Sequence, residues 1–448
     1  MEKTIDMTQG KPWKLLLRFS LPILIGYLFQ QVYTLADRVI VGQFVGADAF
    51  SAVGSTTAIT SMFMSMCMGA SNGAGVVVAQ YHGAGDKKNT AAAIANGVYI
   101  NLAVTAVMTV IALLTTRPIL RLLNTPDSLM EDAASYMLIY MGGLIAVTAY
   151  YVPFSILQAL GDSKTPLIFL IFCSVLNIVL DIIFVVPFGM GVNGAAIATV
   201  LAQLIAAACC ITYTFRKVPV VRAAVKNARQ NKGLMVKTVK VSLPAGFQYS
   251  LVYLSSIVLQ RVVNGFGSDV IGAFTATTQM EILVEQVYTS LGAAIMTYTG
   301  QNIGAGKVKR VSEGLQSALV VSTIVSVAIA VVFWIFGHPI MGIFVNNNTM
   351  ISIAATGIRI TSSFFIALGA VQILRFLLSG AGDAGFTLIN GIVEIVVRIT
   401  LVFLLTGEAV LGKWGIWFTT GFTWLATALF ALWRYKGGKW KSKSLTEN

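Results

Sequence analysis

The chain has 448 residues, of which 56% are hydrophobic and 11% are charged, and its mean hydropathy is +0.79. This composition excludes a soluble globular domain of the same size, in which about 25% of the residues are charged. The formal net charge is +13, and we expect the excess of basic residues to lie in loops beside a membrane rather than on a nucleic-acid-binding surface.

Twelve apolar stretches follow one another along the chain, each long enough for a helix that crosses a bilayer, which needs about 20 residues. They are continuous rather than alternating, which favours helices over a β-barrel. Six lie in the first half, at 15–41, 49–79, 91–115, 133–157, 166–186 and 193–215. Six lie in the second half, at 241–263, 270–299, 311–336, 351–378, 386–405 and 414–435. The sequence therefore predicts an all-α polytopic membrane protein with twelve transmembrane helices.

The two halves repeat one another at a shift of 221 positions. This shift relates three pairs of motifs: Gln80 to Gly85 with Gln301 to Gly306, Gly161-Asp162 with Gly382-Asp383, and Gly194 with Gly415. It slips by one near the start, where Ser20-Leu21-Pro22 matches Ser242-Leu243-Pro244. Each repeat holds an even number of spans, so the two six-helix repeats are parallel. We expect an N-terminal lobe at 1–215, a basic linker at 216–240, a C-terminal lobe at 241–436 and a tail at 437–448.

Lysine and arginine are concentrated at the two ends of the chain and in the connections after spans 2, 4, 6 and 8, which together hold 23 of the 31 basic residues. Because basic loops stay on the cytoplasmic side, we expect both termini to be cytoplasmic in a multi-pass protein of the plasma (inner) membrane. The linker 216–240 has eight basic residues and no acidic one. It can be a simple connection that follows this rule, or a surface helix bound to anionic lipid.

Five acidic residues lie inside the predicted spans, where a charge costs about 2.5 to 3.5 kcal/mol and is kept mainly for function. They are Asp37, Asp181, Glu281, Glu285 and Glu394. In the first span, Gln30, Tyr33 and Asp37 are spaced by three and four, so they share one face of a helix. Asn177 and Asp181 share a face of the fifth span in the same way.

The directions of the spans place four polar groups at a similar depth in the outer part of the membrane: Asp37, Asn177, Asp181 and Thr199. Two carboxylates with amide and hydroxyl oxygens suit a small hard cation such as Na⁺, or a proton held by one of the acids. The alternative is a polar network that only fixes helix packing.

The second half lacks this set of residues. In the shared register, the equivalents of Asp37, Asn177 and Asp181 are Val258 (or Leu259 in the slipped register), Arg398 and Val402. The polar groups of the second half are therefore expected to serve another purpose.

The predicted spans of the second half contain two other pairs of charged residues. Glu394 and Arg398 are spaced by four and can form an ion pair on one helix. Glu281 and Glu285 share a face of the eighth span, with only Arg398 or Arg359 expected to neutralise them. A water-filled cavity that attracts cationic solutes is one interpretation, and its candidate residues are Met280, Glu281, Glu285 and Arg398.

No pattern in the chain predicts catalysis or a cofactor. Gln301 stands where a phosphate-binding loop needs Gly, and Val308 where it needs Ser or Thr. The four cysteines lie inside spans without metal-ligand spacing. We expect no enzymatic activity and no cofactor, only a coupling ion, H⁺ or Na⁺.

Three features give the chain a resemblance to the multidrug and toxic compound extrusion (MATE) transporters over essentially its whole length. They are Pro22 followed by Gln30, Tyr33 and Asp37; the loop from Gln80 to Asp86; and Asn177, Asp181 and Thr199. The resemblance implies two six-helix lobes around a central cavity. It also implies export of amphipathic, often cationic compounds, driven by inward flow of H⁺ or Na⁺.

The chain is most similar to the DNA-damage-inducible-type prokaryotic branch of that family. In this branch, the cation-coupling site is formed by the residues that match Asp37, Asn177, Asp181 and Thr199, with Tyr33 and Gln30 beside it. A bend at the residue matching Pro22 is a proposed switch. The other prokaryotic branch carries acids in spans 7 and 10, which this chain lacks.

We therefore expect a secondary active multidrug efflux transporter that acts as a monomer by alternating access. Its partners would be small amphipathic or cationic substrates and the lipid bilayer. One alternative is a flippase for lipid-linked or other solutes, whose cavity would need arginines such as Arg359, Arg375 and Arg398. A major-facilitator carrier would need an Asp-Arg-rich loop after span 2, which is absent. The buried Asp37 and Asp181 disfavour a membrane scaffold.

Overall fold

The computed structural model describes residues 4–123, 125–226, 231–345 and 347–446. All regular structure in these residues is helical, which confirms the predicted all-α class. In a bilayer, every backbone N–H and C=O group must find a partner within the protein, and a helix supplies these partners inside a single segment.

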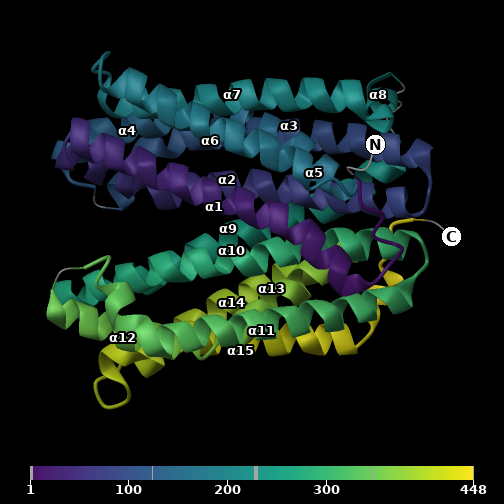
Figure 1. Cartoon of the computed structure of the whole chain (residues 1–448). Helices are drawn as coiled ribbons and strands as arrows, with labels where there is room; N and C mark the ends of the chain where they lie inside the picture. The colour runs from purple at the N-terminus through teal and green to yellow at the C-terminus, as the bar shows by residue number, and fades with distance from the viewer. Residues whose placement is uncertain (1–3, 124, 227–230, 346, 447–448) are drawn as a thin grey trace. The chain divides into compact units, whose positions relative to one another are not determined.

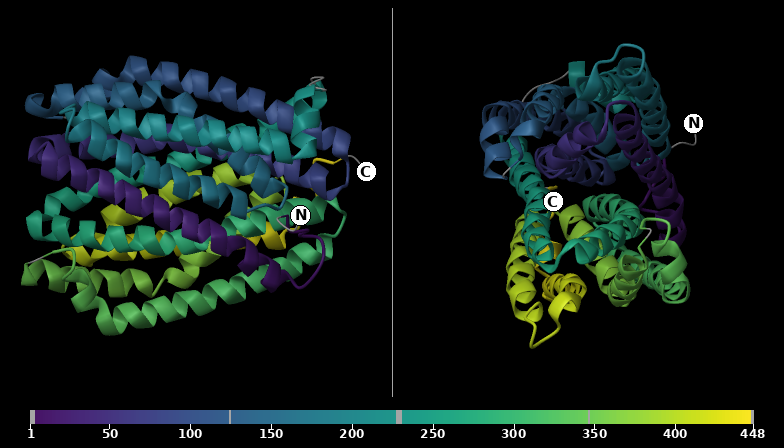
Figure 2. Two further views of the ribbon diagram at one scale, coloured as in Figure 1. Left: turned by 45° about the horizontal axis from the view of Figure 1, so that its top comes forward. Right: turned by 90° about the vertical axis from the view of Figure 1, so that its left-hand side faces the viewer.

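The helices follow the two halves of the chain (Figure 1). Those of the first half are α1 (Pro12–Phe44), α2 (Ala47–Gly83), α3 (Lys87–Leu122), α4 (Asp127–Gly142), α5 (Leu144–Ala159), α6 (Lys164–Val185), α7 (Gly191–Lys217) and α8 (Pro219–Lys226). Those of the second half are α9 (Lys232–Val263), η1 (Asn264–Phe266), α10 (Ser268–Gly304), α11 (Val308–Met341), α12 (Asn348–Ser362), α13 (Phe365–Gly380), α14 (Ala384–Leu405), η2 (Gly412–Trp414), α15 (Gly415–Lys436) and η3 (Lys439–Ser442). Within each half, the long helices lie side by side (Figure 2).

Two of the predicted spans are broken helices. The stretch 133–157 is divided between α4 and α5, which meet at 44°, and 351–378 is divided between α12 and α13, which meet at 50°. Both breaks fall where two small residues adjoin, Gly142-Gly143 and Ser362-Ser363, and such pairs are common sites of sharp helix kinks.

Among the described residues, eight helices are long and apolar enough to cross a membrane, and each bent pair adds one more if it is read as a single broken span. Helices α9 and α10, which are not among these ten, cover the predicted spans 241–263 and 270–299, so all twelve predicted spans are helical. The break recurs in the fourth span of each half, and the turns between helices recur with it. Gly85 and Gly306 have φ of 73° and 71°, and Gly161 and Gly382 both have φ of 89°.

The chain forms two compact units, whose boundaries differ from those of the predicted lobes. Among the described residues, unit 1 contains 4–6 and those of Leu21–Ser250, and unit 2 contains Met7–Ser20 and those of 251–446. The division therefore falls inside α1 and α9 rather than in the linker 216–240. Of that linker, 219–226 form α8 and 232–240 begin α9, while 227–230 lie outside the described residues.

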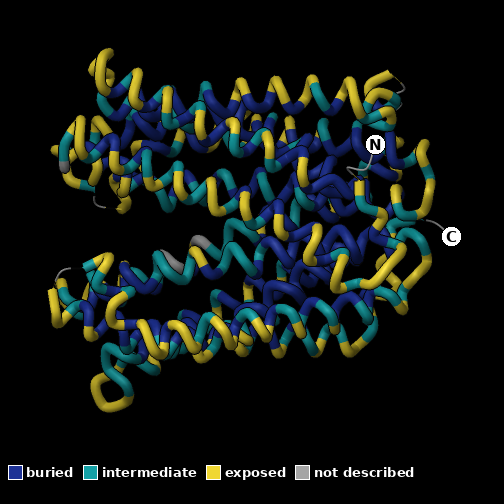
Figure 3. The backbone as a smooth tube through the Cα atoms, in the orientation of Figure 1, coloured by how far each residue is buried: buried dark blue, intermediate teal, exposed yellow. Residues whose placement is uncertain are grey.

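Helix α11 of unit 2 exposes apolar side chains and buries small polar ones. Five of its exposed side chains form an apolar stripe at helical spacing: Val320, Ile324, Val327, Val331 and Ile335. The small polar side chains of Ser322 and Ser326 are buried instead. This arrangement, apolar outside and polar inside, reverses that of a soluble protein and suits contact with lipid (Figure 3).

Unit 1 packs α2 against α9 through two glycines. A Cβ atom at Gly73 would lie 2.6 Å from Cα of Ser242, and one at Gly69 would lie 2.7 Å from the carbonyl oxygen of Ala245. The two glycines are four residues apart and share one helix face. In lipid, where the hydrophobic effect does not draw helices together, such small residues allow the backbones to make close van der Waals contact.

We expect Gly73→Ala to lower the melting temperature of the purified protein, because the new methyl group meets backbone rather than a movable side chain. Overpacking of this kind costs about 1–3 kcal/mol. Gly54→Ala is the matched control on the same helix, since nothing lies within 4 Å of a Cβ at that position. Equal melting temperatures for the two variants would contradict this description of the contact.

Candidate functional site

The candidate cation site in unit 1 is built from α1, α6 and α7. The four residues predicted to form it are almost fully buried, with exposed fractions of 8% for Asp37, 1% for Asn177, 0% for Asp181 and 7% for Thr199. Asn177 and Asp181 lie one turn apart on α6. The Asn177 side-chain amide donates to Oγ1 of Thr199 on α7 at 3.3 Å, and that hydroxyl donates to the carbonyl of Ala195 at 3.1 Å.

The oxygen atoms of this group lack donors. Oδ1 of Asp37, Oδ1 of Asn177 and both carboxylate oxygens of Asp181 are buried and have no hydrogen-bond partner among the described residues. The carboxyl groups of Asp37 and Asp181 are close enough to interact electrostatically. A buried acceptor without a partner costs about 1–3 kcal/mol, and more when it is charged. Four acceptors from three residues thus form a set that a cation or protons would satisfy.

Tyrosines surround the acids in unit 1. Tyr136 on α4 interacts electrostatically with Asp37, Asp181 and Tyr33, and its ring stacks on Tyr140 with centroids 6.0 Å apart. Sequence reasoning missed Tyr136. Its spacing of four from Tyr140 inside an apolar span was the signal that could have found it.

The other two predicted residues, Tyr33 and Gln30, lie about one and two turns before Asp37 on α1. Tyr33 is half-buried. Gln30 donates from Nε2 to the hydroxyl of Tyr151 on α5 at 3.3 Å. Because Gln30 is bonded to another helix rather than to an acid, it connects α1 to α5 at this point.

Pro22 is buried within α1, which continues as one helix on both sides of it. Proline has no backbone N–H, so the carbonyl of Arg18, four residues earlier, receives no helical hydrogen bond from it. A helix is easiest to bend at such a point.

Unit 2 contains a buried ionic triad. Arg375 on α13 and Arg398 on α14 donate to the two carboxylate oxygens of Glu394, at 2.6 Å and 2.9 Å. The triad is nearly sealed from solvent, since each residue is at most 8% exposed. Arg375 also donates to Oδ1 of Asn390 at 3.1 Å. The pair of Glu394 and Arg398 was predicted from its spacing, but the participation of Arg375 was not.

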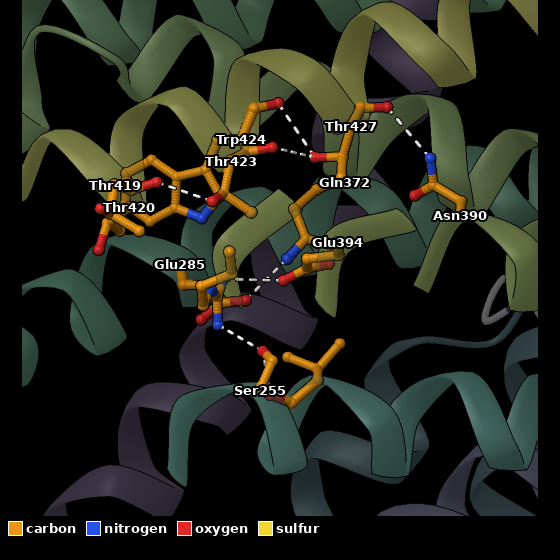
Figure 4. Close-up of polar contacts among 12 residues, drawn as sticks. Ser255, Glu285, Gln372, Asn390, Glu394, Thr419, Thr420, Thr423, Trp424 and Thr427 are labelled. Carbon is orange, nitrogen blue, oxygen red and sulfur yellow. Dashed lines mark hydrogen bonds and ion pairs between the residues drawn. The ribbon is translucent and has the colours of Figure 1, made fainter. Parts of the chain in front are cut away.

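Further polar contacts extend from the triad (Figure 4). Gln372 donates to Oε1 of Glu285 at 2.7 Å, and the Asn390 amide donates to the carbonyl of Thr427 at 3.1 Å. Glu285 has Arg375 and Arg398 as charged neighbours, together with Glu394. These contacts place Glu285 at the edge of the ionic network.

Glu281 lies one turn before Glu285 on α10 and is half-buried. It faces Thr361 of α12 and interacts electrostatically with Glu285 and Arg398. Met280 is partly buried and packs against the apolar core of unit 2. Of the two arginines expected to neutralise these glutamates, Arg398 is a charged neighbour of both, whereas Nε of Arg359 donates to the carbonyl of Trp334 at 3.2 Å.

Within the described part of the chain, no three His, Cys, Asp or Glu side chains gather closely enough to hold a metal ion. A cation at the unit 1 group would therefore be held by two carboxylates together with the amide oxygen of Asn177 and the hydroxyl oxygen of Thr199. Such hard oxygen ligands suit Na⁺ better than a transition metal.

Known proteins resemble the chain along its whole length. A model of the MatE family matches residues 22–183 and 244–404. YpnP of Bacillus subtilis, a probable multidrug resistance protein, is 28% identical over 443 residues, with 99% of each chain covered. MepA of Staphylococcus saprophyticus, a multidrug export protein, is 21% identical over 406 residues, covering 91% of this chain and 90% of that protein. A crystal structure of MATE in complex with MaL6 is 21% identical, with a TM-score of 0.91 and coverage of 99% of this chain and 100% of the other.

Proposed function

This chain belongs to the MatE family of membrane transporters, and we propose that it exports small amphipathic or cationic compounds from the cell in exchange for H⁺ or Na⁺. The names of its relatives, a multidrug resistance protein and a multidrug export protein, support this substrate class. We further propose that it acts as a monomer in the plasma membrane, with both termini cytoplasmic. The clustering of basic residues at its ends and in the connections after spans 2, 4, 6 and 8 supports that orientation.

The observation that carries the proposal is the set of unpartnered oxygens in unit 1. A network that only fixed helix packing would pair its polar groups, because a half-satisfied buried network is less stable than an apolar one. Here Oδ1 of Asp37, both carboxylate oxygens of Asp181 and the amide oxygen of Asn177 have no donors among the described residues. The exchange of a cation or a proton at these oxygens is the function that explains why they are buried and unpaired.

In the proposed mechanism, cation binding and drug binding favour different states of an alternating-access cycle. A cation at Asp37 and Asp181 neutralises buried negative charge, and α1 then repacks around Pro22. That change favours release of the drug on the outer side. One positive charge moving inward through 100 mV yields about 2.3 kcal/mol, which sustains a solute gradient of roughly 50-fold per ion.

We propose that Glu281 gives the substrate site its preference for cations, with Met280, Glu285 and Arg398 beside it. Glu285 is held by Gln372, whereas Glu281 is half-exposed and has no arginine bonded to it among the described contacts. Met280 adds a flexible apolar surface that adapts to different ligands.

Glu281→Gln is expected to slow the export of a cationic dye at least tenfold while leaving a neutral dye within twofold of wild type. The reason is that the amide keeps the shape of the site and removes its charge. The measurement compares the two dyes in the same vesicles. If both dyes are slowed equally, Glu281 does not select for charge.

Everted membrane vesicles test the function as a whole. A pH or Na⁺ gradient is imposed, and the extrusion of a fluorescent cationic dye is followed with and without an ionophore that collapses the gradient. Dye movement that needs the gradient supports the proposal and identifies the coupling ion. Dye movement without any gradient, or none with either ion, contradicts it.

A flippase for lipid-linked solutes fits the contacts less well. Such a protein needs free cationic side chains for phosphate groups. Both Arg375 and Arg398 are bonded to Glu394, and Glu285 is a second acidic neighbour of the two arginines, so two carboxyl groups balance the two guanidinium groups at that place.

A further inference from the structure

Arg398 occupies in unit 2 the sequence position that Asn177 occupies in unit 1. The shift of 221 positions relates these two residues and the helices that carry them, α14 and α6. The same comparison relates α9 to α1, where Ser255 corresponds to Tyr33 in the slipped register and to Thr34 without the slip. Arg398 and Ser255 therefore lie on the two helices whose counterparts carry the acids of the proposed cation site.

The guanidinium group of Arg398 joins these two helices. One terminal nitrogen donates to Oγ of Ser255 on α9 at 2.6 Å, and the other donates to Oε1 of Glu394 on α14 at 2.9 Å. In unit 1, the corresponding helices α1 and α6 carry Oδ1 of Asp37 and Oδ1 of Asn177, which have no donors among the described residues. There a free cation is needed to make the connection that Arg398 makes in unit 2.

Unit 2 lacks an acidic residue at the position of Asp181 that could bind an exchangeable cation. Val402 stands where unit 1 has Asp181 and is fully buried. Both oxygens of Glu394 are already bonded to arginine. Thr199 of unit 1, in contrast, has a threonine as its counterpart, Thr420. Each of the two hydroxyl groups donates to the carbonyl four residues earlier.

We propose that Arg398 is a tethered cation, which takes in unit 2 the place that the exchangeable cation takes in unit 1. This inference rests on the proposed cation site at Asp37. A guanidinium group stays protonated in proteins and cannot leave, so the contact between α9 and α14 is kept throughout the transport cycle. A group that is bound equally well in the inward-open and the outward-open state does not shift the equilibrium between them. Only unit 1 then responds to the coupling ion, and Arg398 is a positioning residue.

Three substitutions at one position test this proposal. Arg398→Lys keeps a tethered charge, Arg398→Gln removes it, and Arg398→Ala leaves space for a free cation. The melting temperature of each purified protein and its dye extrusion in everted vesicles are measured with and without millimolar methylguanidinium. We expect the Lys variant to exceed the Gln variant in both properties. Methylguanidinium should raise the melting temperature of the Ala variant and at least double its rate of dye extrusion. It should change neither quantity in wild type.

Two results would overturn the proposal: equal behaviour of the Lys and Gln variants, or a folded Ala variant that gains nothing from methylguanidinium. If the Ala variant does not fold, the comparison of Lys with Gln decides alone. Asp37→Asn is measured beside them. Its ion-driven extrusion tests the proposed function, whereas the melting temperatures at Arg398 test the tethered cation, so the two failures are distinguishable.

Discussion

Asp37→Asn is expected to reduce gradient-driven dye extrusion to the background level while the protein still folds and inserts. The amide has nearly the shape of the carboxylate, so the packing of α1 against its neighbours is kept. It cannot take up a proton, and it offers a cation no negative charge. Two carboxylates interact in the native group, and losing one removes much of the attraction that holds a cation away from water.

The comparison needs equal amounts of inserted protein, measured on the same vesicles. Asp48→Asn is the matched control, because Asp48 is an exposed acid in the first turn of α2. We expect this control to extrude dye at the wild-type rate. Wild-type extrusion by Asp37→Asn would show that the acid is a packing residue, and the coupling scheme would then fail.

Glu394→Gln is expected to be the most destabilising single change in unit 2, at about 3–5 kcal/mol. The substitution removes the only carboxylate bonded to either Arg375 or Arg398 in the described contacts. The two arginine side chains are only 9% and 7% exposed, so water cannot replace the lost partner. Breaking a buried ion pair from one side leaves a charge in a poorly polarisable environment, and that penalty exceeds the value of the pair itself.

The measurement is the melting temperature or chemical unfolding of the purified protein in detergent. Glu131→Gln is the control, because Glu131 pairs with Arg117 at the surface, where the two side chains are 76% and 49% exposed. Exposed pairs contribute about 0–1 kcal/mol, so this variant should melt close to wild type. If Glu394→Gln melted as high as Glu131→Gln, the triad would not be a stabilising element of unit 2.

The membrane-spanning helices could be predicted from the sequence because lipid imposes a simple constraint: a segment must be apolar over about 20 residues. The breaks between α4 and α5 and between α12 and α13 could not be predicted in this way. Hydropathy is unchanged across Gly142-Gly143, and a kink depends on local backbone geometry. The division into units inside α1 and α9 likewise depends on contacts between distant segments, such as Gly73 with Ser242.

The contacts of the candidate site were predictable only along a single helix. The spacing of Glu394 and Arg398 indicated their ion pair, because residues four apart meet on a helix face. The bond from Asn177 to Thr199 and the presence of Tyr136 beside the acids depend on how neighbouring helices rotate and pack. The bond from Arg375 to Glu394 was not predicted for the same reason, since the sequence does not show which face of a helix contacts its neighbours.

The most direct test of the account is whether the drug displaces the cation from the purified protein. Binding linkage is reciprocal, so a cation whose binding weakens that of the drug must itself be released when the drug binds. In weakly buffered detergent solution, or with the protein loaded with radioactive Na⁺, adding a transported dye should release H⁺ or Na⁺ from wild type. It should release neither from Asp181→Asn. Equal release from both proteins would contradict the assignment of the cation to the buried carboxyl groups of unit 1.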